Sequence, residues 1–223
     1  MTEQEIIERL SQTSFFADAS PALIAEVAAT GSVRHLVRGD VLFEKGDPPD
    51  ALYLVESGRI AIVMSSALDR RESVVALMEP GDLFGELSML DDGPRSAMAR
   101  ALEATAVLAV PFTAVRMLFE REPRLLWNVT RLLAARVRVM DEVIADSVFL
   151  DVTGRTAKRL LELSAGSDEF QLPVTQEELA GMVGASRERV NKAISSFIRL
   201  GWMEQHERTY RVLQRERLEL RAR

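Results

Sequence analysis

The sequence contains no cysteine and only two histidines among its 223 residues. Without thiols, the chain cannot form disulfides, iron–sulfur clusters, thiolate zinc sites or a cysteine nucleophile. His35 and His206 give no obvious haem ligand, and no acid–base or nucleophile constellation is present. We therefore expect a protein that is not an enzyme and that holds no metal, haem or iron–sulfur cluster.

Long hydrophobic runs are also missing. The longest, residues 104–112, is interrupted by Thr105 and Pro111, and a membrane span needs about 20 apolar residues. The first residues are acidic where a secretory signal is basic. The composition, 47% hydrophobic and 28% charged, excludes a disordered chain. These features predict a cytoplasmic protein of one large or two small domains, with no membrane partner.

The net charge of −6 is unevenly distributed along the chain. Residues 1–150 carry 15 Lys and Arg against 23 Asp and Glu, whereas residues 186–223 carry ten against five. An acidic body with a basic end is compatible with nucleic-acid binding by the last part of the chain. Many enzymes also end in a basic helix, so the charge pattern alone does not decide between these classes.

Apolar patterning divides the chain into a helical start, a strand-rich middle and a helical end. Residues 2–30 predict two short helices, with Ile6 and Leu10 on one face of the first and Ser20-Pro21 opening the second. From about Ser32 to Pro111, glycines separate short runs of Val, Ile and Leu that predict the strands of a barrel or sandwich. These runs are 41–43, 52–55, 60–64, 73–78 and 106–110.

A long helix is expected from about Pro123 to Ser147, with an apolar stripe at steps of three and four residues. The stripe consists of Leu126, Val129, Leu133, Val137, Met140 and Ile144. It has the period of a coiled-coil seam, so it either pairs two copies of the chain or packs on its own domain, and its length favours dimerisation. Asp151-Val-Thr-Gly-Arg is expected to break this helix, before a helix from Thr156 to Ala165 and a strand over 170–174.

Residues 175–192 follow the pattern of a helix-turn-helix. Thr175 with Glu178 predicts a capping box, Gly184 permits a tight turn, and Ser186 caps the second helix. The residues expected to face the interior are Leu179, Met182 and Val183 of the first helix and Val190, Ile194 and Phe197 of the second. Residues 202–213 are expected to follow as a β-hairpin, the wing.

The second helix of this motif carries polar side chains off its apolar face, at Arg187, Glu188, Arg189, Asn191 and Lys192. Side chains near the start of such a helix reach base edges when it lies in the major groove of DNA. Arg and Lys suit guanine, and Glu can accept from cytosine. A purely structural hairpin with a solvated charged face is the alternative, but the succession of cap, turn glycine, second cap and wing favours DNA recognition.

Residues 81–97 join a tight turn to a carboxylate and, nine positions later, to an arginine and a hydroxyl. Gly85 lets the backbone approach a ligand, and the amides of a short helical turn beginning at Glu86 can bind an anion. Arg95 offers a planar fork for a phosphate, Ser96 adds a donor, and Glu86 can accept from a sugar hydroxyl. The pattern predicts a ribose-phosphate site, with an ion pair between Glu86 and Arg95 as the alternative.

The segment Phe84-Gly-Glu-Leu-Ser, followed by Pro94-Arg-Ser-Ala, resembles the phosphate-binding cassette of cyclic-nucleotide-binding domains. With Phe149-Leu-Asp-Val-Thr-Gly-Arg and residues 175–192, the whole chain resembles bacterial transcription factors of the CRP/FNR family, the cyclic AMP receptor protein branch in particular. The resemblance implies an α+β fold in three parts. These are a jelly-roll-like β-roll sensor (1–121), a long dimerisation helix (122–148) and a winged helix-turn-helix (149–223).

The same resemblance implies a homodimer that binds double-stranded DNA and RNA polymerase under the control of a cyclic nucleotide. The nucleotide would be contacted by Gly85, Glu86, Leu87, Ser88, Arg95 and Ser96. The DNA would be contacted by Thr175, Ser186, Arg187, Glu188, Arg189, Asn191 and Lys192. Lys192 stands where the best-known member has Arg, so it keeps the charge but loses the bidentate fork.

One pair of residues departs from the family's pattern. The base-contacting pair, a Thr followed by Ser or Asn in the family, falls on Met140 and Asp141. Met140 cannot bond the adenine amino group usefully, and the acceptor Asp141 suits the paired donors of guanine better than adenine. Cyclic AMP is therefore the expected effector, with cyclic GMP as its competitor. A constitutive regulator, one that responds to another effector, and a regulatory subunit without DNA function are the alternatives.

Overall fold

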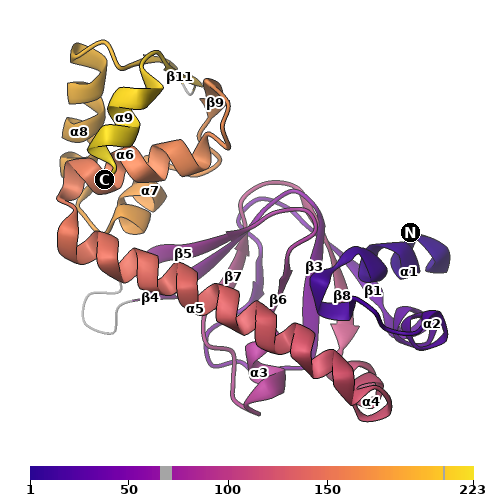
Figure 1. Ribbon diagram of the computed structural model, residues 1–223. Helices are drawn as coiled ribbons and strands as arrows, with labels where there is room; N and C mark the ends of the chain where they lie inside the picture. Colours follow the sequence, from indigo (N-terminus) through magenta and orange to yellow (C-terminus); the bar gives the residue numbers. More distant parts are fainter. Residues whose placement is uncertain (66–71, 208) are drawn as a thin grey trace. The chain divides into compact units, whose positions relative to one another are not determined.

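The computed structural model describes residues 1–65, 72–207 and 209–223 (Figure 1). The chain forms two compact units. The first combines Met1–Met64 with Val75–Arg138, and the second combines Ser65–Val74, as far as it is described, with Val139–Arg223. Among the described helices, none has both the length and the apolar character that a membrane span requires.

The first unit begins with α1 (Glu3–Gln12), the short 3-10 turn η1 (Ser14–Phe16) and α2 (Pro21–Thr30). Thr2 and Glu5 close a capping box on α1. Pro21 lies in the first turn of α2, where its missing N–H removes no helical hydrogen bond. The two short helices predicted for residues 2–30 are confirmed.

Two four-stranded sheets form the middle of the first unit (Figure 1). One has the order β1 (Ser32–Leu36), β8 (Thr105–Pro111), β3 (Ala51–Ser57), β6 (Leu83–Phe84), and the other has the order β2 (Val41–Phe43), β7 (Met98–Ala101), β4 (Ile60–Ser65), β5 (Glu72–Met78). The predicted fold of short strands is confirmed. The prediction from apolar runs missed β1, β6 and β7. In β1 polar residues alternate with apolar ones, and β6 has only two residues.

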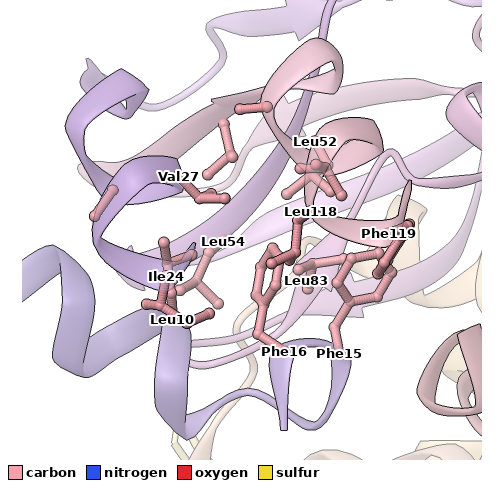
Figure 2. Packing of buried hydrophobic residues seen from close by; sticks show 14 of the residues in the cluster. Leu10, Phe15, Phe16, Ile24, Val27, Leu52, Leu54, Leu83, Leu118 and Phe119 are labelled. Carbon is pink, nitrogen blue, oxygen red and sulfur yellow. The ribbon is translucent and has the colours of Figure 1, made fainter. Parts of the chain in front are cut away.

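The central strand β3 is buried on both faces. Leu52 and Leu54 face a core that α2, η1 and α4 (Phe112–Arg121) share with the sheet, and Figure 2 shows their packing with Phe15 and Phe119. Tyr53 and Val55, on the alternate positions of β3, face a second hydrophobic cluster, to which both four-stranded sheets contribute residues. This second cluster also contains Phe84, the first residue of the candidate cassette, so it anchors the start of the site.

The long helix begins later than predicted, because Pro123–Leu125 forms a 3-10 turn (η2) before α5 (Leu126–Phe149). The apolar stripe of α5 then has two environments. Val129 is buried in the first core and Leu133 packs against it, whereas Val137, Met140 and Ile144 are 55%, 62% and 59% exposed. Packing on its own unit therefore accounts for Val129 and Leu133 and leaves the second half of the stripe uncovered in a single chain.

The second unit continues with α6 (Val152–Leu163), β9 (Glu169–Gln171), α7 (Gln176–Val183), α8 (Arg187–Arg199), β10 (Met203–His206), β11 (Thr209–Val212) and α9 (Arg215–Arg221). The start predicted for α6 at Thr156 is wrong, since the Asp151 carboxylate caps the helix by accepting from the Gly154 amide at 2.8 Å. The predicted strand 170–174 is shorter and earlier, because Pro173 has no N–H for a ladder.

The predicted wing is confirmed as a three-stranded sheet in the order β10-β11-β9. Tyr210 of β11 is buried and stacks on Phe170 of β9 with ring centroids 5.9 Å apart. The tip of the predicted hairpin includes residue 208, which lies outside the described residues.

Candidate functional sites

Gly85 forms the turn between β6 and the short helix α3 (Leu87–Leu90). Its φ of +84° lies in the left-handed region that favours glycine. A Cβ at this position would lie 2.8 Å from Nη1 of Arg95. Glycine is therefore required twice here, by the backbone conformation and by the close approach of the arginine.

The guanidinium of Arg95 is buried and held by the chain itself. Nη1 donates to the Gly85 carbonyl at 2.9 Å, and Nη2 donates to the Ala51 carbonyl at 2.6 Å. Nη2 also lies 3.4 Å from Oδ1 of Asp50, and the guanidinium carbon lies 4.3 Å from the centre of the Phe43 ring. Burial lowers the pKa of Arg95. Its Nε has no partner among the described residues.

The carboxylate of Glu86 is fully buried at the start of α3. Its Oε1 pairs with Arg136 of α5, and Arg136 also donates to the Leu83 carbonyl at 2.9 Å. Burial raises the pKa of Glu86, and the charge of Arg136 partly opposes that rise. The alternative of a Glu86–Arg95 ion pair is wrong, since Glu86 pairs with Arg136 and Arg95 with Asp50.

Sequence reasoning missed both Arg136 and Asp50. Arg136 is separated from Glu86 by 50 positions, and Asp50 from Arg95 by 45. The only available signal was the position of Arg136 four residues before Met140, one turn earlier on the same helix.

The other predicted ligand residues have different surroundings. The Ser88 hydroxyl is buried and donates to the Pro94 carbonyl at 3.1 Å, so it ties the two ends of the cassette together. The side chains of Leu87 and Ser96 are exposed. Met140 and Asp141 lie beyond Arg138, in the second unit, and both are exposed. Their position relative to the cassette stays a prediction.

The cassette therefore holds two buried polar atoms without a partner in the described chain, the donor Nε of Arg95 and the acceptor Oε2 of Glu86. Buried polar groups in folded proteins are nearly always hydrogen-bonded. An unpaired donor on a cation beside an unpaired acceptor on a carboxylate suits a ligand that has both an anionic group and a hydroxyl. For metal ions, no group of three His, Asp or Glu within 1–65, 72–207 and 209–223 could act as a site.

The predicted helix-turn-helix is confirmed in α7 and α8. The hydroxyl of Thr175 accepts from the Glu178 amide at 3.1 Å, and the Glu178 carboxylate accepts from the Thr175 amide at 2.7 Å. Gly184 ends α7 with a φ of +68°, and the Ser186 hydroxyl caps α8. Both hydroxyl oxygens act as acceptors in these caps, so each O–H can still donate to a DNA phosphate.

The first turns of α8 present charges to solvent. Arg187, Glu188, Arg189 and Lys192 are exposed, and within the described part of the chain their side chains make no hydrogen bond or ion pair. Asn191 differs from them, because it is half-buried and its Oδ1 is buried without a partner. The predicted DNA residues thus fall into an exposed set and one residue turned toward the interior of the unit.

Five other cations of the second unit are held in ion pairs, which are Lys158–Asp146, Arg159–Glu162, Arg211–Glu169, Arg215–Asp168 and Arg221–Asp151. Beside α8 lies a pocket of about 420 Å³, lined in part by three cations of that helix that have no ion pair in the described chain, Arg189, Lys192 and Arg199. Sequence reasoning missed Arg199. The free positive charge of α8 and this pocket form a surface suited to a polyanion.

Comparison with known protein families gives two matches. Residues 33–122 match the cyclic nucleotide-binding domain, and residues 154–221 match the Crp-like helix-turn-helix domain. The two matches fall on the cassette and on the α7–α8 motif, in that order along the chain.

The curated relatives bear the names of transcription regulators and not of enzymes. The chain is 35% identical over 223 residues to the "CRP-like cAMP-activated global transcriptional regulator" of Mycobacterium tuberculosis, covering 97% of this chain and 99% of the relative. It is 36% identical over 164 residues to the "Cyclic AMP receptor protein" of Thermus thermophilus, covering 74% and 76%.

Solved structures agree with this similarity. The Thermus thermophilus catabolite activator protein is 32% identical, with a TM-score of 0.54 over 94% of this chain and 98% of that one. FixK2 of Bradyrhizobium japonicum has a TM-score of 0.76 over 85% and 96%, but at 20% identity it supports the fold alone.

Proposed function

The chain belongs to the CRP/FNR family of DNA-binding transcription regulators, and on that premise we propose that a cyclic nucleotide controls how a homodimer of it binds a near-palindromic operator. The observation that carries the nucleotide part is the pair of unpartnered buried atoms in the cassette, Arg95 Nε and Glu86 Oε2. A cyclic phosphate supplies the anion for the first, and the ribose 2′-hydroxyl supplies the donor for the second.

The cassette's backbone completes the proposed phosphate site. Amides near Gly85 and Leu87, at the start of α3, can donate to the phosphate together with the hydroxyl of Ser96, which is exposed and makes no hydrogen bond within the described chain. The carbonyls that hold the Nη atoms of Arg95 fix the plane of its guanidinium, so its direction toward the ligand is set before binding.

Two observations bear on the base of the nucleotide. The names of the relatives favour cyclic AMP. The pair Met140 and Asp141 favours guanine, because an ionised carboxylate only accepts hydrogen bonds and the guanine edge offers two adjacent donors. We propose cyclic AMP as the effector, with cyclic GMP as the second candidate on the strength of Asp141.

The exposed half of the α5 stripe supports the proposed dimer. Val137, Met140 and Ile144 are each more than half exposed on one helix face, a spacing that suits the same face of a second copy. Ile144→Glu should convert the dimer to a monomer in sedimentation, whereas Val37→Glu, at a position that is 66% exposed in the first unit, should leave it dimeric. A dimer unaffected by Ile144→Glu would contradict this interface.

For DNA, we propose that Arg187, Glu188 and Lys192 contact base edges and that Thr175, Ser186 and Arg189 contact phosphates. In the dimer the two α8 helices would enter successive major grooves about 34 Å apart, so the operator would be nearly palindromic. RNA polymerase is the further partner expected of a transcription regulator at a promoter.

The proposed mechanism is a shift between two dimer arrangements. Arg136 connects the cassette to α5, because it pairs with Glu86 and lies on the helix that carries the dimer face. A ligand that bonds Glu86 changes the electrostatic partner of Arg136, and it therefore has a differential contact with α5 in the two arrangements.

Calorimetric titration with cyclic AMP and cyclic GMP, followed by operator binding at saturating nucleotide, tests the proposal. We expect one of the two to bind and to tighten operator binding. If neither binds at millimolar concentration, the nucleotide part fails. If a bound nucleotide leaves the operator affinity unchanged, the result would instead support a constitutive regulator. Failure of the protein to bind any genomic fragment would support a regulatory subunit without DNA function.

A further inference from the structure

Helix α9 packs directly on the first turn of α6. Leu218 of α9 is fully buried, and a Cβ on Gly154 of α6 would lie 2.9 Å from Nη1 and 3.0 Å from the backbone oxygen of Arg221. Gly154 is also buried, so this contact has little room to relax. The absence of a side chain at Gly154 is what allows α9 to lie this close.

At that contact, Arg221 binds the carboxylate that caps α6. Its Nη2 bonds both oxygens of Asp151. Oδ1 of Asp151 also accepts from the Gly154 amide at 2.8 Å, and this bond starts the helix. The hydrogen bond from Arg221 is the largest cause that lowers the pKa of Asp151. One carboxylate therefore serves both as the cap of α6 and as the attachment point of α9.

Asp151 lies at the connection between the long helix and the DNA-binding part of the chain. Helix α5 ends at Phe149 and α6 begins at Val152, so only Leu150 and Asp151, which we call the hinge, join them. Arg155, one turn into α6, donates to the Leu150 carbonyl at 2.8 Å and to the Val183 carbonyl at 2.9 Å. The hinge is thus tied to the last residue of α7, just before the turn that leads to the recognition helix α8.

We infer that α9 is a latch on the hinge: by holding Asp151, Arg221 positions the first turn of α6 and so sets how strongly nucleotide binding changes DNA binding. The second half of this inference rests on the proposed function, whereas the hold on Asp151 does not. Arg215 fixes the other end of α9, because it contacts Asp168 at 3.1 Å and donates to the Ser167 carbonyl at 2.7 Å. The latch is therefore anchored at both ends of the helix.

A stabilising surface ion pair is the competing explanation, since the Asp151 side chain is 64% exposed and such pairs contribute little. The two explanations differ in what they predict for the hinge. A surface pair affects overall stability at most. A latch restricts the torsions of two residues, and its loss lets the hinge adopt further orientations, of which only some are competent for DNA binding.

The test compares Arg221→Gln with Arg217→Gln in the full-length protein. Arg217 lies on the same helix, is exposed, and has no ion pair or hydrogen bond of its side chain within the described ranges, so it is a matched control. We expect faster amide hydrogen exchange at residues 152–156 in Arg221→Gln only. We also expect the ratio of operator affinities with and without cyclic AMP to fall about fivefold, the lower end of allosteric coupling.

Asp151→Asn provides a second variant that keeps the helix cap, since Asn is as good a capping residue as Asp. It should lower the affinity ratio as Arg221→Gln does, and the double variant should show no further loss. Additive losses would overturn the latch, as would an Arg221→Gln protein that matches Arg217→Gln in exchange or in the affinity ratio.

If cyclic nucleotides do not change the operator affinity of the wild-type protein, the proposed function fails separately from the latch. The latch is then judged on the operator affinity of the ligand-free protein. A loss of about fivefold in Arg221→Gln, again the lower end of coupling energies, supports it. Equality with Arg217→Gln overturns it.

Discussion

The cassette and the recognition helix use charged residues in opposite ways. In the cassette, Arg95 and Glu86 are buried, and each is oriented by carbonyls or by a second charge. On α8, Arg187, Glu188 and Lys192 are exposed and make no side-chain bonds within the described residues. Both regions are prepared for a phosphate-containing partner, but one by a fixed, enclosed geometry and the other by free charge on a surface.

This difference follows from the size of the partner. A small ligand can be surrounded, so a few desolvated contacts supply most of its affinity, and each is strong because water is excluded. DNA can only be approached from one side, so many solvated contacts share the binding energy and respond to salt. Substitutions in the cassette should therefore be severe and independent of salt, whereas those on α8 should be graded and dependent on sequence and salt.

The largest effect is expected for Arg95→Ala. Removing a buried charge that is hydrogen-bonded on several sides leaves the carbonyls of Gly85 and Ala51 unpaired and takes away the proposed phosphate contact. We expect a loss of about 3–5 kcal/mol in nucleotide affinity by calorimetry, with the dimer intact by sedimentation. Arg59→Ala, which removes two exposed ion pairs of the same unit, is the control. A nucleotide response retained in Arg95→Ala would contradict the pocket assignment.

Glu86→Gln should have the next largest effect, about 1.5–3 kcal/mol, the contribution of a hydrogen bond to a charged group. Because burial raises the pKa of Glu86 above the ordinary 4.5, wild-type affinity should fall as pH decreases through that raised pKa, and the Gln variant should lack this fall. Titrations from neutral pH toward pH 4.5 check this, with Glu103→Gln, at an exposed position, as control.

Glu86→Gln should also change the thermal stability of the protein. A carboxyl whose folded pKa is raised contributes stability in acid, and that contribution is lost as pH rises through the folded pKa. At pH values above that raised pKa the ionised Glu86 therefore opposes folding, and ligand-free Glu86→Gln should there melt no lower than wild type. A lower melting temperature at those pH values would mean that the pair with Arg136 outweighs the desolvation of the carboxylate.

Arg187→Ala tests the exposed charges of α8. We expect a loss of about 1–3 kcal/mol on the preferred operator and a relaxed base preference at one position of each half-site. Binding selections at two salt concentrations measure both, with Arg217→Ala as the control for removing an exposed arginine. An equal loss on every sequence would make Arg187 a phosphate contact and not a base contact.

The smallest effect is expected for Thr175→Ala, at the start of α7. Loss of the capping box should cost about 1 kcal/mol of unfolding free energy. Thr175→Ser keeps the hydroxyl and should restore most of that stability, which thermal unfolding of the two variants measures. Equal melting temperatures for Thr175→Ser and Thr175→Ala would show that the capping box contributes nothing to stability. If the two variants then differed only in DNA affinity, the Thr175 hydroxyl would act only as a phosphate contact.

The recognition motif could be predicted from sequence because its determinants are local. Thr175 and Glu178 are three residues apart, and Gly184 and Ser186 mark the turn and the second cap within one segment. The short strands were also predictable where both faces are apolar, as in β3, and were missed where polar residues alternate, as in β1.

The partners of the cassette could not be predicted, because tertiary packing brings them together over long separations. Asp50, just before β3, reaches Arg95 in the loop between α3 and β7, and Arg136 reaches Glu86 from α5. The start of α6 was missed for a different reason. The segment Asp151-Val-Thr-Gly-Arg was predicted to break the long helix before α6, whereas the structure places Gly154 inside α6, at the close approach of α9.

The division of α5 into a buried and an uncovered half limits how this helix can move. Rotating it rigidly about its own axis would pull Val129 out of the core, and losing a side chain of that size to water costs roughly 1.5–3 kcal/mol. The core therefore holds the part of α5 around Val129 and Leu133 in place. We therefore expect a displacement of α5 to begin beyond Leu133, by bending or sliding of its second part. Arg136, which pairs with Glu86, is the first charged side chain after that point.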